Sequence, residues 1–153
     1  LTKGMNVMDG YYNNPEASNT VLSPDGWLHT GDLGVLDPDG YLYIKGRSKS
    51  LILGPSGQNI YPEEIEDLLN AQPYIAESLV IEREGKLVAL VYPDAEAMKQ
   101  NKISREALLK IIHETRKQIN QQIPAYSQIA RIEIHDEEFE KTPKRSIKRF
   151  LYQ

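Results

Sequence analysis

The residues best suited to chemistry begin with a turn in the first third of the chain, Thr30-Gly-Asp32, inside the run Gly26-Trp-Leu-His-Thr-Gly-Asp-Leu-Gly34. Glycine lets a ligand approach the backbone closely, and a fixed carboxylate accepts two O–H hydrogen bonds. That chemistry suits a vicinal diol such as a ribose, although the same carboxylate could simply cap N–H groups of the turn. Arg47 follows a short predicted hairpin, so its guanidinium can return to the same site.

Two further segments contain residues of chemical interest. The loop Gly54-Pro-Ser-Gly-Gln-Asn-Ile60 contains Gly57, which serves either a strand-to-helix turn or the close passage of a ligand. Basic residues gather in the run Lys141-Thr-Pro-Lys-Arg-Ser-Ile-Lys-Arg149, which taken alone also fits a solvated basic tail. The histidines lie far apart and cysteine is absent, so we expect no metal site.

Composition limits the classes of function. The 153 residues are 40% hydrophobic and 26% charged, with a formal net charge of −4, which argues against a general nucleic-acid binder. No apolar run could span a bilayer, and no secretory signal opens the chain. The lack of cysteine fits a reducing compartment, so we expect a cytoplasmic protein. Because Leu1 is not a natural start, we expect the chain to be cut from a longer one.

The hydrophobic pattern predicts an α+β protein with a boundary near residues 48 to 50. Residues 1–49 look β-rich, with a hairpin around Pro38-Asp-Gly40. Residues 50–153 are predicted to form a small α+β domain with a central sheet and flanking helices. Its expected strands are residues 51–53, 77–82, 86–92 and 130–135, and its expected helices begin at Pro62, Ser104 and Ile147.

Two expectations concern the surfaces of these helices. Glu64 and Glu66 follow Pro62 closely and are interpreted as helix-start and surface charges. The helix capped by Ser104 should end at Pro124. Its predicted buried stripe is Leu108, Leu109, Ile112, Ile119 and Ile123.

In this order and spacing the motifs resemble the adenylate-forming superfamily of acyl-CoA synthetases, luciferases and peptide-synthetase adenylation domains. The resemblance runs from about Gly4 to Tyr152 and includes Gly46-Arg47 and Ser56-Gly-Gln-Asn-Ile-Tyr-Pro-Glu-Glu-Ile-Glu66. The amino-acid sequence of that second motif is most similar to the motif of the long-chain acyl-CoA synthetases. The resemblance implies that a carboxylate attacks the α-phosphate of ATP, and that the thiol of coenzyme A then displaces AMP from the acyl-adenylate.

The resemblance also implies roles for single residues. Asp32 would hold the ribose hydroxyls, and Arg47 would contact the ribose side of ATP or AMP. Ser50 stands where the family has a hinge residue, usually Asp or Lys. A hinge needs backbone freedom more than a particular charge, so Ser50 can serve. Gly57 would lie along the tunnel for the pantetheine arm of coenzyme A, where a side chain would obstruct the thiol.

One position departs from the family pattern. Ser146 occupies the place of a lysine that contacts carboxylate and phosphate oxygens during adenylation, and a hydroxyl cannot supply the field of a cation. Three alternatives stay open. Lys144 or Lys148 substitutes for it, the protein is slow at adenylation yet competent for the thioester step, or the cluster is only a solvated basic tail.

We therefore hypothesise that the chain is the C-terminal part of an ATP-dependent acyl-CoA synthetase of the long-chain fatty acid type. Residues 1–49 would end its large domain, and residues 50–153 would be its mobile lid. Nucleotide, fatty acid and coenzyme A would bind together with the upstream domain, which would also supply the ligands of the Mg2+ that the family implies. This fragment alone should be inactive. Peripheral membrane contact is compatible with the sequence, and the competing hypothesis is a degenerate nucleotide-binding or regulatory module.

Overall fold

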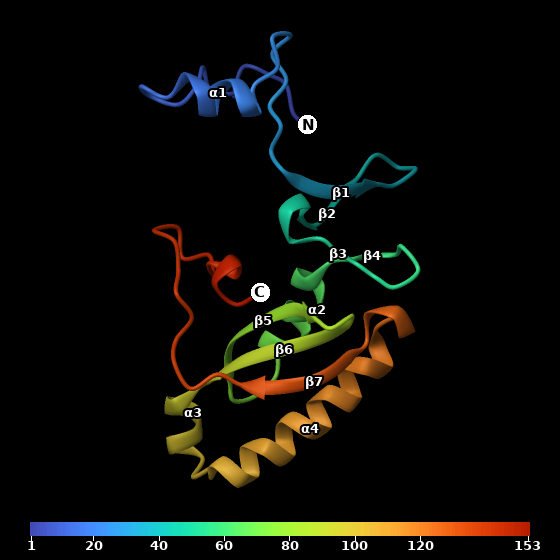
Figure 1. Ribbon diagram of the computed structural model, residues 1–153, viewed down its shortest axis with the longest axis vertical. Helices are drawn as coiled ribbons and strands as arrows, with labels where there is room; N and C mark the ends of the chain where they lie inside the picture. Colours follow the sequence, from blue (N-terminus) through green and yellow to red (C-terminus); the bar gives the residue numbers. More distant parts are fainter. The chain divides into compact units, whose positions relative to one another are not determined.

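The computed structural model describes residues 1–153, which form two compact units, Leu1–Lys49 and Ser50–Gln153 (Figure 1). The strands of the first unit make one hairpin, in which β1 (Asp32–Leu36) pairs antiparallel with β2 (Leu42–Arg47). In its turn Asp37 Oδ1 accepts hydrogen bonds from two backbone N–H groups, and Gly40 has a φ of +88°, which favours glycine. The hairpin predicted around Pro38-Asp-Gly40 is confirmed.

The first unit also contains a helix that the sequence pattern did not predict. α1 (Pro15–Val21) begins at Asn14, whose side chain accepts a hydrogen bond from the N–H of Ala17. An Asn cap followed by Pro is a strong start signal, but a helix of this length is too short to show apolar periodicity. The residues before Asp32 otherwise form only isolated bridges. The β-rich character of the first unit is therefore limited to residues 32–47.

A three-stranded sheet of order β5-β6-β7 is the centre of the second unit. β5 (Ile75–Arg83) runs antiparallel to β6 (Lys86–Pro93), and β6 runs parallel to β7 (Ile129–Ile134). The connection from β6 to β7 contains α3 (Ala95–Gln100) and α4 (Arg105–Gln122). The short pair β3 (Ile52–Leu53) and β4 (Asn59–Ile60) precedes α2 (Pro62–Asn70). The predicted α+β class is confirmed, while α3 was not expected from the sequence.

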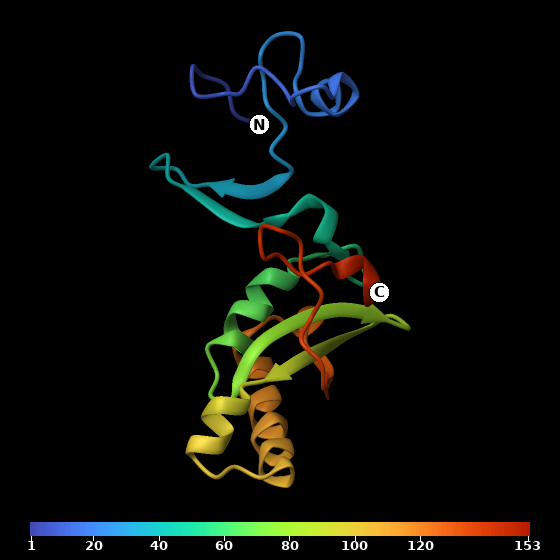
Figure 2. The same ribbon diagram turned by 90° about the vertical axis from the view of Figure 1, so that its left-hand side faces the viewer.

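Apolar side chains alternate along the sheet and bury both of its faces. On one face Val80, Ala89 and Val91 belong to a core cluster with residues of α2 and α4. On the other face Leu79, Ile81, Val88 and Leu90 pack with Phe139, which follows β7. The C-terminal segment therefore covers the side of the sheet that faces away from α4 (Figure 2).

The long helix α4 follows its predicted start but not its whole predicted stripe. Ser104 caps it, because the Ser104 hydroxyl accepts a hydrogen bond from the N–H of Ala107 at 3.1 Å. The prediction that Leu109 is buried was wrong, since its side chain is 53% exposed. Thr115 completes the buried stripe instead, because the spacing from Leu108 follows the helical period and the neighbouring residue points about 100° away.

The C-terminal helix is shorter than predicted. Only one 3-10 turn forms, from Arg149 to Leu151. None of the helices combines the length and the apolar character needed to cross a bilayer.

The exposed position of Leu109 can be tested against its buried neighbour Leu108, which is 2% exposed. Leu108→Ala should lower the free energy of unfolding by about 2–5 kcal/mol because it leaves a cavity in the core. Leu109→Ala should change it by less than about 0.5 kcal/mol. Urea unfolding followed by circular dichroism measures both, and equal losses would contradict the assignment of the helix face.

Candidate functional site

Asp32 and Arg47 face each other across the hairpin of the first unit. They are the first residue of β1 and the last of β2, and they are direct partners in the strand register. The Nη1 atom of Arg47 forms an ion pair with Oδ1 of Asp32, and the side chains are 61% and 33% exposed respectively. The two side chains therefore present a donor and an acceptor side by side at an accessible place. Their role toward a ribose stays a prediction.

Backbone contacts hold the turn that precedes Asp32. The Thr30 hydroxyl accepts a hydrogen bond from the Asp32 N–H at 3.1 Å, and the Ser48 N–H donates to the Gly31 carbonyl at 2.8 Å. Gly31 has a φ of +75°, and a Cβ atom at this glycine would lie 3.8 Å from Arg47 Nη2. Glycine is thus required by the backbone conformation, and it also leaves room beside the guanidinium.

Ser50, the predicted hinge, ends a 3-10 turn that begins at Ser48. It is partly buried and is the first residue of the second unit. Its position between the two units is compatible with a hinge, and that role stays a prediction.

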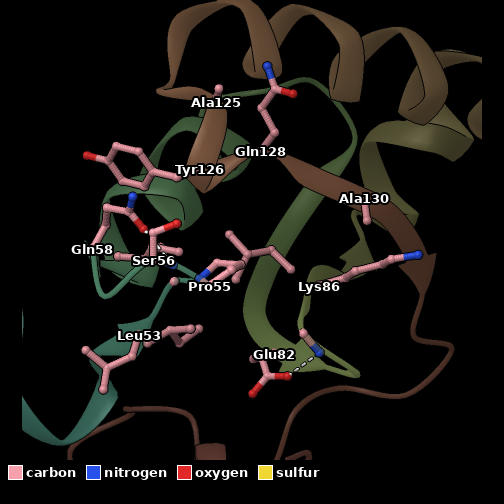
Figure 3. A pocket seen from close by; sticks show the side chains of 15 residues that line it. Leu53, Pro55, Ser56, Gln58, Glu82, Lys86, Ala125, Tyr126, Gln128 and Ala130 are labelled. Carbon is pink, nitrogen blue, oxygen red and sulfur yellow. Dashed lines mark hydrogen bonds between the residues drawn. The ribbon is translucent and has the colours of Figure 1, made fainter.

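The loop between β3 and β4 borders a cavity of about 550 Å³ in the second unit (Figure 3). Its polar lining includes the side chains of Gln58, Lys86, Tyr126 and Gln128. The cavity lies between the loop, the β5–β6 turn and the start of β7. This volume falls in the range of about 300–1,000 Å³ found for small-molecule sites.

Gly57 is explained by its backbone and not by crowding within the second unit. It has a φ of +79°, and a Cβ atom at this position would meet nothing within 4 Å. The turn itself therefore requires glycine. A role of Gly57 in leaving space for a pantetheine arm stays a prediction.

Residues 140–148 form what we call the C-terminal hairpin. The Lys148 N–H donates to the Glu140 carbonyl and the Thr142 N–H to the Ser146 carbonyl, both at 2.8 Å. Lys144 and Ser146 are exposed at its tip. Arg145 has a φ of +62°, a left-handed conformation that a long side chain rarely adopts.

Two of the four cations of this hairpin, Lys141 and Lys148, are already paired. Lys141 contacts Glu77 at 2.7 Å and also pairs with Glu138, and Lys148 contacts Glu140 at 3.0 Å. Of the two lysines predicted to substitute for the family lysine, Lys144 forms no ion pair and Lys148 does. Arg145, next to Lys144 and also exposed, forms none either. No group of three or more His, Asp or Glu side chains that could hold a metal ion is present, so these residues do not form a site for Mg2+.

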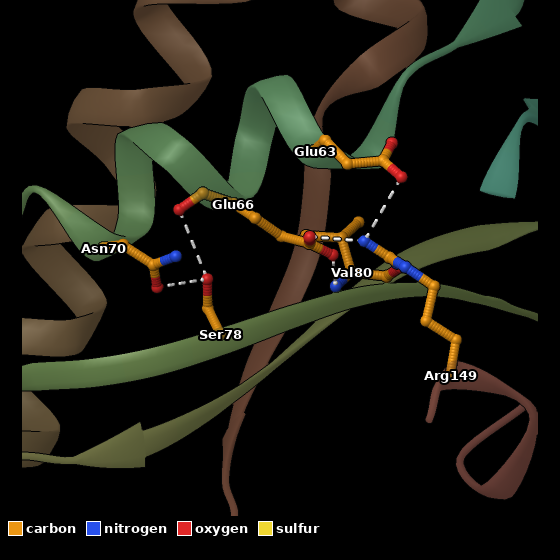
Figure 4. Close-up of polar contacts among 6 residues, drawn as sticks. All are labelled: Glu63, Glu66, Asn70, Ser78, Val80 and Arg149. Atoms are coloured by element: carbon orange, nitrogen blue, oxygen red, sulfur yellow. Dashed lines mark hydrogen bonds and ion pairs between the residues drawn. The ribbon is translucent and has the colours of Figure 1, made fainter. Parts of the chain in front are cut away.

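A buried ion pair in the second unit was missed at the level of the sequence (Figure 4). Glu66 is 8% exposed, and its Oε1 accepts a hydrogen bond from the Val80 N–H at 2.6 Å. Its other oxygen pairs with Nη2 of Arg149, which lies 3.7 Å from Glu63 Oε1 as well. Arg149 Nη1 donates to the Val80 carbonyl at 3.3 Å. Arg149 is therefore not part of a solvated tail.

The interpretation of Glu66 as a surface charge was wrong. It belongs to the buried stripe of α2 together with Pro62, Ile65 and Leu69. The spacing i, i+3, i+4, i+7 defines such a stripe, so helical periodicity alone placed this carboxylate on the inner face. Glu64 is exposed, as expected.

Comparison with known proteins gives a family match over most of the chain. Residues 49–152 match the model of a family described as the AMP-binding enzyme C-terminal domain. An indoleacetate–CoA ligase of Aromatoleum aromaticum is 48% identical over 95 residues, which is 60% of this chain and 18% of that protein. A 2-succinylbenzoate–CoA ligase of Bacillus cereus is 40% identical over 114 residues, 74% of this chain and 23% of that protein. The chain thus spans about a fifth of the length of these relatives.

Solved structures agree with this match. The O-succinylbenzoate coenzyme A synthetase of Bacillus subtilis, in complex with AMP, has a TM-score of 0.70 at 29% identity. That match covers 99% of this chain and 29% of that chain. The adenylation domain of a carboxylate reductase from Mycobacterium chelonae has a TM-score of 0.78 at 22% identity, which shows a shared fold, and covers 94% and 24% of the two chains.

The buried position of Glu66 makes a prediction for pH dependence. Burial raises the pKa of Glu66 above its ordinary value of 4.5, while the Arg149 guanidinium and the Val80 N–H oppose the rise. A raised pKa in the folded state means that the stability contributed by this group is fully present below pH 4.5 and is lost as pH rises through the folded pKa.

As pH rises above 4.5, the free energy of unfolding of Glu66→Gln should therefore fall less than that of wild type. Arg149→Met should raise the pKa of Glu66 further, because it removes the guanidinium that opposes the rise. Carbon-13 NMR of the Glu66 carboxyl and urea unfolding at several pH values measure these effects. An unchanged pKa in Arg149→Met would contradict the role assigned to the ion pair.

Proposed function

Because the chain belongs to the family of AMP-binding enzyme C-terminal domains, we propose that it is part of an ATP-dependent acid–coenzyme A ligase. In the first step a carboxylate oxygen attacks the α-phosphorus of ATP and releases pyrophosphate. In the second the thiol attacks the acyl carbon, and AMP leaves with the oxygen that joined it to the acyl group. The observation that supports this most is the family match over residues 49–152.

The hairpin of the first unit supports a nucleotide-binding role. A carboxylate that is held in place accepts hydrogen bonds from both hydroxyls of a ribose, and the adjacent guanidinium orients it. Asp32 and Arg47 form such a pair at an accessible position. We assign the ribose contact to Asp32 and a contact beside it to Arg47, with Ser50 as the hinge between the two units.

The loop around Gly57 and the neighbouring cavity support the second step. Tyr126, Gln58 and Gln128 line the cavity, and Glu82 and Lys86 border it at the β5–β6 turn (Figure 3). The Gln128 amide donates to the Asn120 carbonyl, so the ring of Tyr126 and the amide of Gln58 are the groups that suit a planar heteroaromatic ligand. We assign this region to coenzyme A.

Lys144 is the best candidate for the missing cation of the first step. It is exposed at the tip of the C-terminal hairpin and forms no ion pair, whereas Lys148 is engaged by Glu140. A free ammonium can turn toward carboxylate and phosphate oxygens without first breaking a salt bridge. We therefore assign to Lys144 the stabilisation of charge that Ser146 cannot provide.

Two classes of acid are candidates for the substrate. The relatives named above are ligases of indoleacetate and 2-succinylbenzoate, both of which contain an aromatic ring, and this favours an aromatic acid. The motif from Ser56 to Glu66 resembles long-chain acyl-CoA synthetases and supports a long-chain fatty acid as the second candidate. The whole protein that contains this chain should be assayed with ATP, coenzyme A and indoleacetate, 2-succinylbenzoate or palmitate.

Formation of AMP, pyrophosphate and an acyl-CoA with one of these acids supports the proposal. Nucleotide binding by calorimetry without turnover of any acid would contradict it, and would favour a non-catalytic nucleotide-binding module of the same fold.

The ribose contact predicts a change in the KM for ATP. Asp32→Ala removes charge-assisted hydrogen bonds worth about 1.5–3 kcal/mol, so the KM should rise about 10- to 100-fold. Asp32→Asn keeps one acceptor and should give a smaller rise. Asp39→Ala, at an exposed carboxylate in the turn of the same hairpin, is the matched control and should leave the KM unchanged. An equal KM for ATP in Asp32→Ala and Asp39→Ala would contradict the assignment of Asp32 to the ribose contact.

The cation assigned to Lys144 predicts a slower first step in its absence. Lys144→Ala should lower the rate of pyrophosphate exchange by about 100-fold, the cost of one oriented contact to developing charge. Ser146→Lys in the same variant should recover activity, because it restores a cation at the family position.

Lys110→Ala on α4 is the matched control, and Lys148→Ala should cost less than Lys144→Ala. A larger loss in Lys148→Ala than in Lys144→Ala would assign the role to Lys148 instead.

A further inference from the structure

The network around Glu66 joins parts of the second unit that are distant in sequence (Figure 4). Glu66 lies on α2, Val80 on β5, and Arg149 immediately after the C-terminal hairpin. Ser78 adds a bond between β5 and α2, because its hydroxyl donates to the Glu66 carbonyl at 3.3 Å and contacts Asn70 Oδ1 at 2.8 Å. The guanidinium thus enters a site already built by a helix and a strand.

The site also provides partners for one residue on the open edge of the sheet. β5 is an edge strand, and unpaired N–H and C=O groups on such a strand need partners. Val80 gives its N–H to Glu66 and its carbonyl accepts from Arg149. One ion pair therefore satisfies both backbone groups of this residue. The Arg149 side chain is only 20% exposed, and that of Glu66 is 10% exposed.

Near its second strand the C-terminal hairpin has two attachments besides Arg149. Ile147 packs against the core cluster that contains Leu79 and Phe139, and the Tyr152 hydroxyl accepts a hydrogen bond from the Glu140 N–H at 2.8 Å. The hairpin's own backbone bonds join Glu140 to Lys148 and Thr142 to Ser146, and these fix its shape but not its direction. Lys141 fixes the first strand through Glu77. Arg149 is next to Lys148 in the chain, so the guanidinium holds the end of the second strand.

We propose that Arg149 is a positioning residue, which together with Glu66 fixes the C-terminal hairpin on the second unit and so presents Lys144 at one place. This inference rests on the proposed function of Lys144 in the first step. Arg149 contacts Glu66, Glu63 and the Val80 carbonyl, and we infer that it acts through the hairpin.

The proposal predicts an effect on one chemical step and not on the other. Loss of positioning should slow adenylation by about 10- to 100-fold, the size found when a reacting group is displaced by about 1 Å. The second step, started from supplied acyl-adenylate, should keep its rate, because it does not use the hairpin. A general loss of folded protein would lower both steps together.

The first test needs no enzyme activity. Hydrogen exchange is measured by NMR on this 153-residue chain for the N–H groups of Thr142, Ser146 and Lys148. In Arg149→Met they should exchange about tenfold faster, while N–H groups of β6 keep their rates. Arg149→Lys should be intermediate, since an ammonium can pair with Glu66 but lacks the second, forked donor.

The matched control is Arg105→Met. Arg105 forms an exposed ion pair with Asp136 at the start of α4, and its loss should leave the hairpin unchanged. If Arg149→Met exchanges faster at every position, Glu66→Gln is the deciding variant, because it removes the charge while keeping the size of the side chain. Unchanged hairpin exchange in Arg149→Met or Glu66→Gln would overturn the proposal.

The second test uses the whole protein and separates the two proposals. If wild type forms acyl-CoA and Arg149→Met slows only the first step, both proposals stand. If wild type is active and both steps fall equally at full folding, the positioning role is wrong and the ligase function stands. If wild type has no activity while the hairpin loosens in the first test, the ligase function is wrong and Arg149 still anchors the hairpin.

Discussion

A carboxylate buried between a helix and the edge of a sheet needs a cation, and in the second unit Arg149 supplies it. The partners Glu66 and Arg149 are 83 residues apart. Removal of one member of a buried pair costs about 3–5 kcal/mol, because the other charge stays behind without a partner. The end of the chain is therefore bound to α2 and β5, and the direction of the C-terminal hairpin depends on this contact.

Local signals in the sequence predicted much of the fold. The turn at Pro38-Asp-Gly40 predicted the pairing of β1 with β2. Asp32 faces Arg47 only because a register shift between Leu33 and Gly34 moves the pairing by one residue, and the sequence pattern did not predict that shift. The Ser104 cap and the apolar period predicted α4 in the same way. α1 and α3 were missed since each has only one or two turns. The contact between Glu66 and Arg149 could not be predicted, because only tertiary packing brings its partners together.

Ser146 stands where the family pattern has a lysine, yet the C-terminal hairpin still forms around it. The backbone of the C-terminal hairpin is closed around Ser146, although Arg145 holds a left-handed conformation that costs about 1–2 kcal/mol outside glycine. Of the nearby cations, Lys141, Lys148 and Arg149 are paired, whereas Lys144 and Arg145 form no ion pair. Between the two candidate lysines, only Lys144 is therefore free. That difference, which the sequence alone left open, is the reason for assigning Lys144 to the chemistry.

Activation of an acid through an adenylate transfers one oxygen of its carboxylate to AMP, which distinguishes it from other routes to a thioester. When the carboxylate of the acid is labelled with oxygen-18, its oxygen forms the bond to the α-phosphorus and stays on AMP after the thiol attacks. Mass spectrometry of AMP formed by the whole protein from labelled acid, ATP and coenzyme A should therefore find one labelled oxygen per AMP. AMP without label, formed together with acyl-CoA, would contradict the adenylate mechanism.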